Sequence, residues 1–478
     1  MGFKPFTLRR LFVAMFLAWA AGALPAAAAG PMTDAQLTQD LDTTLDGLVA
    51  QDKFSGAVLL AKRGQVLFEH AYGYADHAFD APNRVDTKFN LGSMGKMFTG
   101  VAMLQLAQQG KLSLDDKLIK DLPDYPNKAI AAQVTLRELL NHTAGLGDFF
   151  GPEFGSGNMA RYDSLESLLP FFVDKPLQSA PGTKWAYSNA GYIVLGLVIQ
   201  HVSGQSYYDY VQQHIFAPAG MVDTGNWPAD ADIPNRAVGY TYMGQPSGAP
   251  RKSNVFMLQR GGSAGGGYST VEDLLRFAEA LEGGKLLDAQ YTRLALSGQV
   301  ATTRPAVKYG FGMEEQMANG VRIVGHGGGG PGIQGILDIY PDSGYEVAIL
   351  SNYDDAMTPV DERLRADLTG EPRLQVATMN ASDLKVYAGR YVPVIPAGMQ
   401  MMGSPPPVII ALGQGGLDVD PGMGPHFFFV PLPDGEFAAK DSPGLRIQFL
   451  RDADGKVTAF KTPTGFGPVP PVLANRLP

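Results

Sequence analysis

The chain has 478 residues, of which 45% are hydrophobic and 18% charged, and its formal net charge is −9. A chain of this length can bury a large core and can hold more than one domain. Its acidic balance, with no run of basic residues, argues against binding to nucleic acid or to anionic membrane surfaces. The sequence has no cysteine, which excludes disulfides and thiolate metal ligands.

Residues 1–29 have the three-part plan of a secretory signal peptide. Lys4, Arg9 and Arg10 precede an apolar run from Leu11 to Leu24, and an alanine cluster ends at Ala29. The run is too short for a comfortable membrane span. We therefore expect a periplasmic or secreted protein with no stable membrane anchor after cleavage. Cleavage would remove three basic and no acidic side chains and leave a net charge of −12.

The next segments alternate between helical and strand patterns. A helical pattern covers residues 32–51, and two strands at 57–62 and 65–72 are joined by a short turn. A largely apolar helix then ends near Gly110. Residues 111–300 are rich in helices and loops.

Strand patterns return late in this part of the chain, at 321–324, 332–340 and 346–351, and a helix follows near 359–368. Strands at both ends with helices between them predict an antiparallel sheet assembled from both ends of the segment, flanked by a helical insertion. After about Ala377, glycines, prolines and short strand patterns indicate a separate small β domain. We thus expect a main domain at 30–376 and a C-terminal β domain at 377–478.

The stretch Ser93-Met94-Gly95-Lys96 places a hydroxyl and an amine one helical turn apart. Residues at i and i+3 share a helix face, so Lys96 can lie beside Ser93 and activate it as a nucleophile. At the N-terminus of a helix, free backbone N–H groups could also stabilise a developing oxyanion. Alone this tetrad is weak evidence, because many surface helices carry a serine and a lysine three residues apart.

A second segment, Tyr187-Ser188-Asn189, precedes an apolar helix predicted at 191–202. The phenol and the amide could face one cleft, with Tyr187 relaying protons and Asn189 holding a substrate or Lys96. The alternative is a polar loop in which the tyrosine packs and the asparagine caps the helix.

A third segment is His326 followed by a run of glycines, Gly327, Gly328, Gly329 and Gly330. Glycines allow another molecule to approach the backbone closely and leave N–H groups available as oxyanion donors. The alternative is a flexible hairpin turn with an incidental histidine.

Taken together, the order Ser-x-x-Lys, Tyr-x-Asn and His-x-Gly resembles the penicillin-recognising serine hydrolases. This family includes class C β-lactamases, D-Ala-D-Ala carboxypeptidases, D-aminopeptidases and related esterases. The resemblance spans Ala35 to Leu368, and further segments resemble family landmarks: 134–146, 218–221, 310–313 and 350–352. It implies an α+β, β-lactamase/transpeptidase-like fold with an antiparallel sheet and a flanking helical region. Residues 383–391 resemble the first strand of the small lipocalin-like β-barrel often appended to this family.

The resemblance also implies roles for the motif residues. Ser93 would form an acyl-enzyme, and Lys96 and Tyr187 would transfer protons; the sequence leaves open which of the two is the working base. Substrate binding would fall to Asn189, His326, Gly327, Gly328 and Gly329, with the N–H groups of Ser93 and Gly329 as the oxyanion hole. Phe149, Phe150 and Trp185 could form an apolar acyl pocket, although core packing explains each equally well.

We expect the substrate to be a small molecule or a peptide. The third motif, at His326, indicates which chemical class it belongs to. β-Lactamases generally have Lys-Thr-Gly there, and the cation and the hydroxyl hold the substrate carboxylate. Here His326 is only partly charged near neutral pH and Gly327 has no hydroxyl. We therefore expect an esterase or a D-amino-acid amidase or peptidase. The alternatives are a β-lactamase or D-Ala-D-Ala carboxypeptidase, and a non-hydrolytic penicillin-binding-like sensor.

Two other interpretations of the sequence, a nucleophile elbow at Ser263 and a histidine metal site, are disfavoured. Gly261-Gly262-Ser263-Ala264-Gly265 fits the Gly-x-Ser-x-Gly nucleophile elbow, but that motif needs a strand directly before the serine, and 251–260 is a mixed polar segment. The seven histidines include no His-Glu-x-x-His pairing. We expect neither a metal site nor a cofactor.

Overall fold

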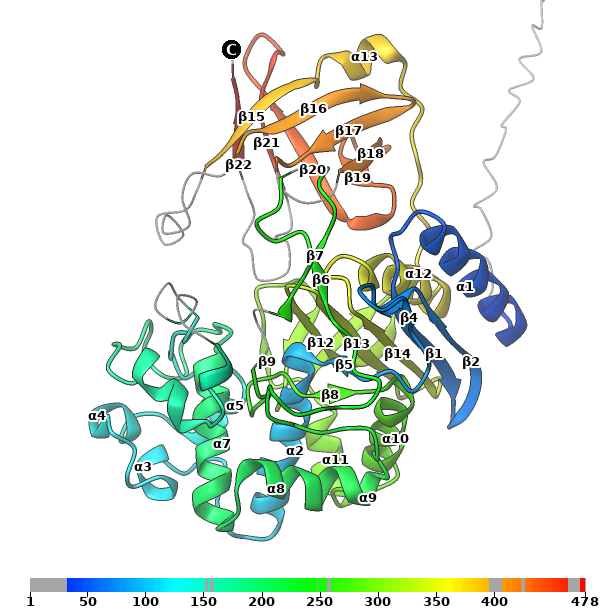
Figure 1. The fold of residues 1–478 in the computed structure, drawn as a ribbon. Helices are drawn as coiled ribbons and strands as arrows, with labels where there is room; N and C mark the ends of the chain where they lie inside the picture. Colours follow the sequence, from blue (N-terminus) through cyan, green and yellow to red (C-terminus); the bar gives the residue numbers. More distant parts are fainter. Residues whose placement is uncertain are drawn as a thin grey trace, which may run out of the picture.

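A large antiparallel sheet is the centre of the fold (Figure 1). The computed structural model describes residues 32–150, 154, 159–246, 248–255, 259–394, 406–422, 426–462 and 473–477. Eight strands follow the order β2-β1-β14-β13-β12-β11-β10-β9. Their bounds are β1 Gly56–Lys62, β2 Gln65–Tyr72, β9 Val300–Ala301, β10 Val307–Tyr309, β11 Glu314–Ala318, β12 Val321–Gly330, β13 Ile333–Tyr340 and β14 Tyr345–Ser351. The predicted sheet is confirmed, since β1 pairs with β14 from the far end of the segment.

The sheet is buried on both faces because its central strands carry apolar residues at successive positions. In β1, Ala57 and Leu59 pack into the core under the helical region, whereas Val58 and Leu60 pack into a second core on the opposite face. Successive side chains of a strand point to opposite faces, so an uninterrupted apolar run requires cover on both sides. The second core is closed by α1 (Asp34–Val49) and α12 (Met357–Thr369).

The helical region covers the other face (Figure 1). Its central helix α2 (Gly95–Gln108) is buried at every position from Gly95 to Gln105, because sheet and helices enclose it from all sides. The remaining helices are α3 Leu118–Asp121, α4 Lys128–Ala131, α5 Leu136–Leu140, α7 Asn189–Ser203, α8 Tyr207–Val211, α9 Ala217–Ala219, α10 Val271–Glu282 and α11 Ala289–Ala295, with 3-10 turns η1 Gly92–Met94, η2 Met159–Arg161 and η3 Glu166–Phe171 and a π turn η4 Gln212–Phe216. Three small ladders complete this part: β3 (Tyr74–Asp76) with β4 (Ala81–Pro82), β5 (Phe89–Asn90) with β8 (Tyr268–Ser269), and β6 (Tyr240–Thr241) with β7 (Lys252–Ser253).

The C-terminal part is a closed eight-stranded antiparallel barrel, which confirms the small β-barrel that the resemblance implies. Its strands are β15 Gly389–Val394, β16 Val408–Gly413, β17 Gly416–Asp420, β18 Phe427–Pro431, β19 Phe437–Ala439, β20 Ser442–Arg451, β21 Val457–Lys461 and β22 Leu473–Arg476. Aromatic side chains, including Tyr391, Phe437 and Phe460, fill its interior. The expectation of a strand over 383–391 is wrong for its first half: Asn380 caps a short helix, α13 (Ala381–Lys385), and the first strand begins at Gly389.

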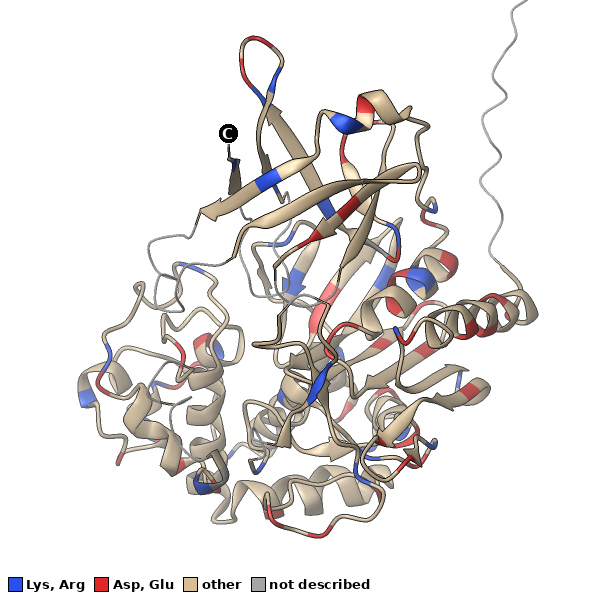
Figure 2. Cartoon of the chain, turned by 45° about the horizontal axis from the view of Figure 1, so that its top comes forward, with Lys and Arg blue, Asp and Glu red and all other residues tan. Residues whose placement is uncertain are grey.

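The barrel makes polar contacts with helix α12 and with Lys53. The backbone N–H of Gly444 in β20 donates to Glu362 at 2.9 Å, and Lys53 pairs with Asp441 of the barrel. Arg363 of the same helix pairs with Asp40 on α1, where acidic side chains gather (Figure 2). The barrel therefore packs against α12, one of the helices that cover the face of the sheet opposite the helical region.

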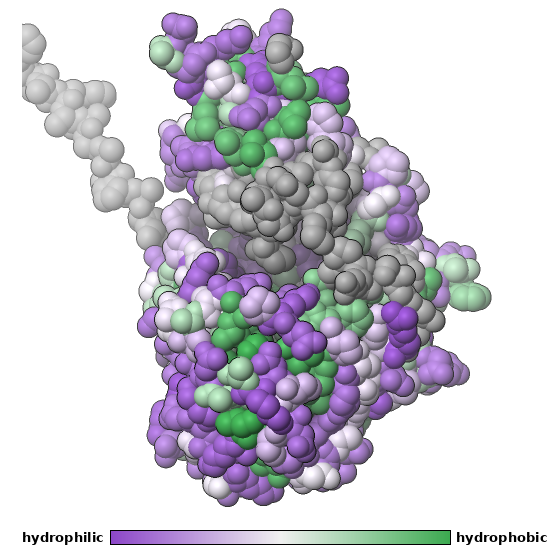
Figure 3. Space-filling view, turned by 90° about the vertical axis from the view of Figure 1, so that its left-hand side faces the viewer, coloured by the Kyte–Doolittle hydropathy of each residue, from purple (hydrophilic) through white to green (hydrophobic). Residues whose placement is uncertain are grey.

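Hydrophilic residues predominate on the face shown in Figure 3, and hydrophobic residues lie in patches between them. Among the residues described, no helix has both the length and the apolar character needed to span a membrane. The predicted signal peptide lies outside the described residues.

Candidate active site

Ser93 lies in η1, the short turn between β5 and α2. The glycine-rich loop at 261–267 holds the start of this turn by two backbone hydrogen bonds. Leu91 N donates to Gly267 O at 3.0 Å, and Gly266 N donates to Gly92 O at 2.8 Å. Gly92 has φ +50°, a left-handed conformation that glycine adopts without a steric penalty. As a result the Ser93 side chain is partly exposed at the N-terminal end of α2.

Lys96 lies one turn further along and is fully buried. Its Nζ contacts Ser93 Oγ at 3.2 Å and Asn189 Oδ1 at 2.7 Å, and it donates to the carbonyl of Ala264. Burial lowers the pKa of Lys96 to about 7, because the charged amine loses its hydration, while the carboxylate of Asp148 opposes the shift. Near pH 7 the amine is therefore neutral in a large fraction of the molecules, and in this form it can accept the Ser93 proton.

Asn189 is the first residue of α7. Ser188 caps this helix by accepting the N–H of Gly191, which turns the Asn189 side chain toward Lys96. Its Oδ1 accepts from Lys96 Nζ and its Nδ2 donates to Asp148 Oδ2 at 2.7 Å. Both ends of the amide are thus engaged within the chain, so the geometry favours the role of holding Lys96 over that of contacting a substrate.

Tyr187 packs its ring against the same amine, with Lys96 Nζ 4.7 Å from the ring centroid. Burial raises the pKa of Tyr187 well above its ordinary value, and the nearby Ser93 hydroxyl only partly opposes this. Its hydroxyl is buried and has no hydrogen-bond partner of normal geometry in the described part of the chain. Tyr187 is therefore protonated at rest, and its O–H is available to a group that enters the site.

The glycines after His326 do not form a hairpin turn, because β12 continues through them to Gly330. This strand lies directly against the Ser93 turn. A Cβ on Gly328 would lie 2.0 Å from the carbonyl oxygen of Leu91, and a Cβ on Gly92 would lie 2.9 Å from Gly329 N. The absence of side chains at these positions brings the Gly329 amide against Gly92, the residue before Ser93.

Gly328→Ala is expected to lower hydrolysis at least about tenfold and to reduce the melting temperature, because the new methyl group would push the Ser93 turn away from β12. Gly330→Ala is the matched control, since its Cβ would meet nothing closer than Ile333 Cδ1 at 3.6 Å. Activity assays and thermal unfolding of both variants check the prediction. Equal behaviour of the two would show that close packing at Gly328 is not needed.

His326 is buried and hydrogen-bonded on both ring nitrogens. Nδ1 faces the Gly327 carbonyl, which can only accept, so Nδ1 carries the proton and Nε2 accepts from Tyr309 Oη at 3.0 Å. Burial lowers the pKa of His326 to about 4. The ring is therefore neutral at physiological pH and offers no positive charge to a substrate.

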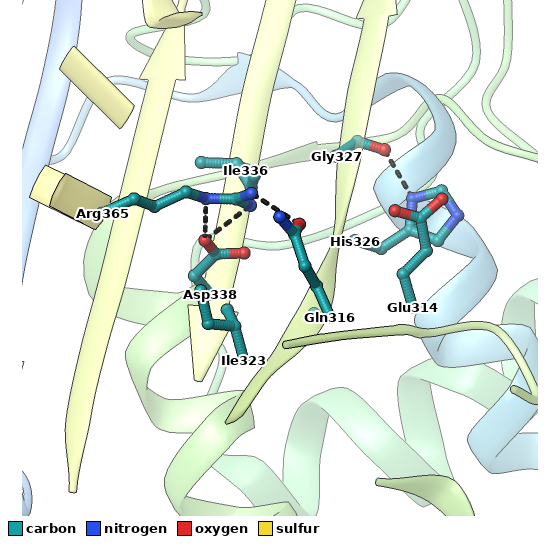
Figure 4. Close-up of a pocket in the computed structure, with 9 residues that line it drawn as sticks. Glu314, Gln316, Ile323, His326, Gly327, Ile336, Asp338 and Arg365 are labelled. Atoms are coloured by element: carbon teal, nitrogen blue, oxygen red, sulfur yellow. Dashed lines mark hydrogen bonds and ion pairs between the residues drawn. The ribbon is translucent and has the colours of Figure 1, made fainter. Parts of the chain in front are cut away.

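A small cavity is lined by residues of β11, β12, β13 and α12. None of Ser93, Lys96 or Tyr187 lines it. Figure 4 shows Arg365 of α12 reaching over the sheet to Asp338 of β13 and Gln316 of β11. Burial raises the pKa of Asp338 to about 7, and the Arg365 guanidinium opposes this. The ion pair with Asp338 and the hydrogen bond to Gln316 join the strands on either side of β12, so they brace the strand that carries His326.

The family model described as Beta-lactamase matches residues 41–370. The chain belongs to the beta-lactamase family.

Relatives within this family include penicillin-binding proteins and amidases. Penicillin-binding protein 4* of Bacillus subtilis (strain 168) is 30% identical over 376 residues, covering 74% of this chain and 81% of that protein. A penicillin binding protein from Bacillus halodurans is 32% identical with a TM-score of 0.62, covering 68% of this chain and 98% of that one. D-amino acid amidase from Ochrobactrum anthropi SV3 is 26% identical with a TM-score of 0.61, covering 70% and 98%. The resemblance inferred from the motifs is confirmed.

Ser263 occupies a position unlike that of a hydrolase nucleophile. It is completely buried between α2 and α7: its carbonyl accepts from Thr99, and a Cβ on Gly196 would lie 2.3 Å from its Oγ. Its hydroxyl has no hydrogen-bond partner among the residues described, so no base activates it. The glycine run around Ser263 instead supports the Ser93 turn.

The aromatic residues singled out from the sequence do not form one wall. Phe149 is buried against Phe150 and Phe154, with ring centroids 4.4 and 5.1 Å away, while Phe150 is 53% exposed. Trp185 packs at the edge of the helical core beside His142. Phe150 is thus the member of the set that is open to solvent.

Two residues that contact Lys96 or its partner Asn189 were not found by motif reasoning. The Ala264 carbonyl accepts from Lys96, and Asp148 binds Asn189. Ala264 lies within the Gly-x-Ser-x-Gly pattern, which was considered only as a possible nucleophile motif. Asp148 lies two residues after the segment 134–146, which resembles a family landmark. Its position close to that segment is the signal that could have revealed it. Within the described ranges no group of three or more His, Cys, Asp or Glu side chains is placed to hold a metal ion.

Proposed function

We propose that this protein is an exported serine hydrolase that cleaves esters or amides through an acyl-enzyme on Ser93. The observation that carries the proposal is the buried Lys96 amine, 3.2 Å from Ser93 Oγ, with a pKa of about 7. A binding module has no need for a desolvated amine next to a serine, because burying that amine destabilises the fold. The hydrolase domain would span 30–376, and the barrel at 377–478 would carry no catalytic group.

Acylation begins when neutral Lys96 takes the proton of Ser93 Oγ. The Oγ–C bond forms, the carbonyl π bond opens, and the negative charge on the carbonyl oxygen is held by the N–H groups of Ser93 and Gly329. The tetrahedral intermediate collapses with cleavage of the C–O or C–N bond, and the leaving group takes a proton from Tyr187 Oη. Tyr187 recovers its proton from Lys96, and water then hydrolyses the acyl-enzyme by the same steps.

The substrate we propose is an ester or an amide of a D-amino acid. A neutral His326, with both ring nitrogens already hydrogen-bonded, and a glycine in place of a hydroxyl residue leave little to bind the carboxylate that β-lactams carry. A relative whose name states D-amino acid amidase supports the amide alternative. β-Lactamase or D-Ala-D-Ala carboxypeptidase activity ranks second.

We expect kcat/KM for a short-chain nitrophenyl ester or a D-amino-acid nitroanilide to exceed that for a chromogenic cephalosporin by about 10- to 100-fold, the value of one missing charged hydrogen bond. Steady-state assays of the purified mature protein measure the ratio. Efficient cephalosporin hydrolysis would instead assign β-lactamase activity to the protein.

Intact-mass spectrometry during turnover distinguishes the hydrolase from a sensor. A hydrolase shows an acyl adduct that appears and then disappears as the substrate is consumed. A permanent adduct with every substrate would support the sensor and contradict the proposal.

A further inference from the structure

Asp148 makes two hydrogen bonds at the edge of the site. Its Oδ2 accepts from Asn189 Nδ2 at 2.7 Å, and its Oδ1 accepts from the backbone N–H of Phe150 at 3.2 Å. The residue is half-buried in the segment that follows α5. It therefore belongs to a chain of contacts that runs from Asp148 through Asn189 and Lys96 to Ser93.

The side-chain amide of Asn189 has two ends of nearly equal shape, one that accepts and one that donates. With Oδ1 toward Lys96, the amide accepts a hydrogen bond from the amine at 2.7 Å. With the ends exchanged, two donors would face each other and the amine would lose that partner. A carboxylate can only accept, so Asp148 binds the donating end and leaves the carbonyl oxygen for Lys96.

We propose that Asp148 is a positioning residue of the reaction, which fixes the orientation of the Asn189 amide and through it the place of Lys96 beside Ser93. This inference rests on the proposed function, because it concerns how the same serine is activated. Its charge has a second effect, since it is the negative group that attracts the Lys96 ammonium. The other titratable groups around the amine are all neutral at rest: Tyr187, Tyr192, His142 and His326.

The test is Asp148→Asn in the full chain, read by the rate at which a fluorescent fluorophosphonate labels Ser93 between pH 5 and 9. The probe reports the nucleophilicity of the serine without requiring a known substrate. We expect the plateau rate to fall about tenfold or more, because Asn189 is no longer held in one orientation. The midpoint of the rise with pH should move about one pH unit lower, since the amine loses its proton more readily without the nearby carboxylate.

Two controls separate positioning from loop stability. Asparagine at 148 can still accept the Phe150 N–H, so the local turn is kept. Asp116→Asn is the matched variant, because Asp116 likewise accepts a turn N–H, from Ser113 at 2.8 Å, in the same helical region. We expect it to change neither the plateau nor the midpoint. Asp148→Glu, which keeps the charge, should restore the midpoint.

A double mutant tests whether Asp148 acts through Asn189. Asp148→Asn should cause no further loss of plateau rate in an Asn189→Ala background. Wild-type plateau and midpoint in Asp148→Asn, or the same change in Asp116→Asn, would overturn the positioning role and leave the proposed function intact. Failure of the probe to label Ser93 in the wild-type protein would overturn both.

Discussion

Ser93→Ala is expected to reduce kcat/KM for every substrate by at least about a thousandfold, because no acyl-enzyme can form without the hydroxyl. Lys96 Nζ lies 3.2 Å from this oxygen, Ser93 also neighbours the Tyr187 hydroxyl, and the Gly329 amide lies against the preceding residue, Gly92. Steady-state assays with the ester and the nitroanilide measure the loss. Fold stability should change little, since the Ser93 side chain is partly exposed.

Ser263→Ala is the matched control, because Ser263 is the serine of the competing Gly-x-Ser-x-Gly pattern. Its hydroxyl is fully buried and carries no hydrogen bond within the described residues, so its removal should leave activity within about twofold. Loss of activity in Ser263→Ala together with retention in Ser93→Ala would overturn the assignment of the site.

Lys96→Met is expected to abolish activity to a similar extent and to stabilise the fold at low pH. The ordinary pKa of a lysine is 10.5, and burial lowers it here to about 7. Below pH 7 the folded protein must hold a buried ammonium, at a cost on the order of 5 kcal/mol. Methionine has a similar length and no charge, so it removes that cost, although the partners of the amine, Asn189 and Ala264, lose their donor.

The sign of the pH dependence follows from the direction of the shift. Between pH 7 and 10.5 the unfolded chain binds more protons at Lys96 than the folded one, so the wild-type protein gains stability as the pH rises and its disadvantage relative to Lys96→Met shrinks. We expect the stabilisation by Lys96→Met to be about 2 to 3 kcal/mol larger at pH 6 than at pH 9. Denaturant unfolding at both pH values measures it.

Lys111→Met serves as the control, because Lys111 is exposed. It should leave activity unchanged and show no such difference between the two pH values. A Lys96→Met stabilisation that is the same at pH 6 and pH 9 would mean that the amine is already protonated in the folded protein, and it would contradict Lys96 as the base.

Much of the fold could be predicted because its signals are local. The apolar run after Ser93 indicates a buried helix, and strands at both ends with helices between them indicate the sheet and its insertion. The short strand patterns after Ala377 indicate a small β domain, and the family resemblance implies that it is a barrel. The strands of the large sheet that were missed, β9 to β11, are short and mostly half-buried or exposed, so they carry a weak apolar pattern. The extension of β12 through four glycines was missed because strand propensity disfavours glycine, whereas pairing with β13 keeps these residues extended.

The residue types of the site and their order could be inferred from local patterns alone, because Ser93 and Lys96 lie one turn apart across η1 and the start of α2 and the other motifs are short and contiguous. The protonation states and the neighbours of these groups depend on how the chain packs. Burial makes Lys96 a neutral base near pH 7 and keeps His326 uncharged. Folding also brings the Ala264 carbonyl to the Lys96 amine and Asp148 to Asn189, which holds that amine. Desolvation and long-range contacts depend on every element that packs around a group, and no local pattern records them.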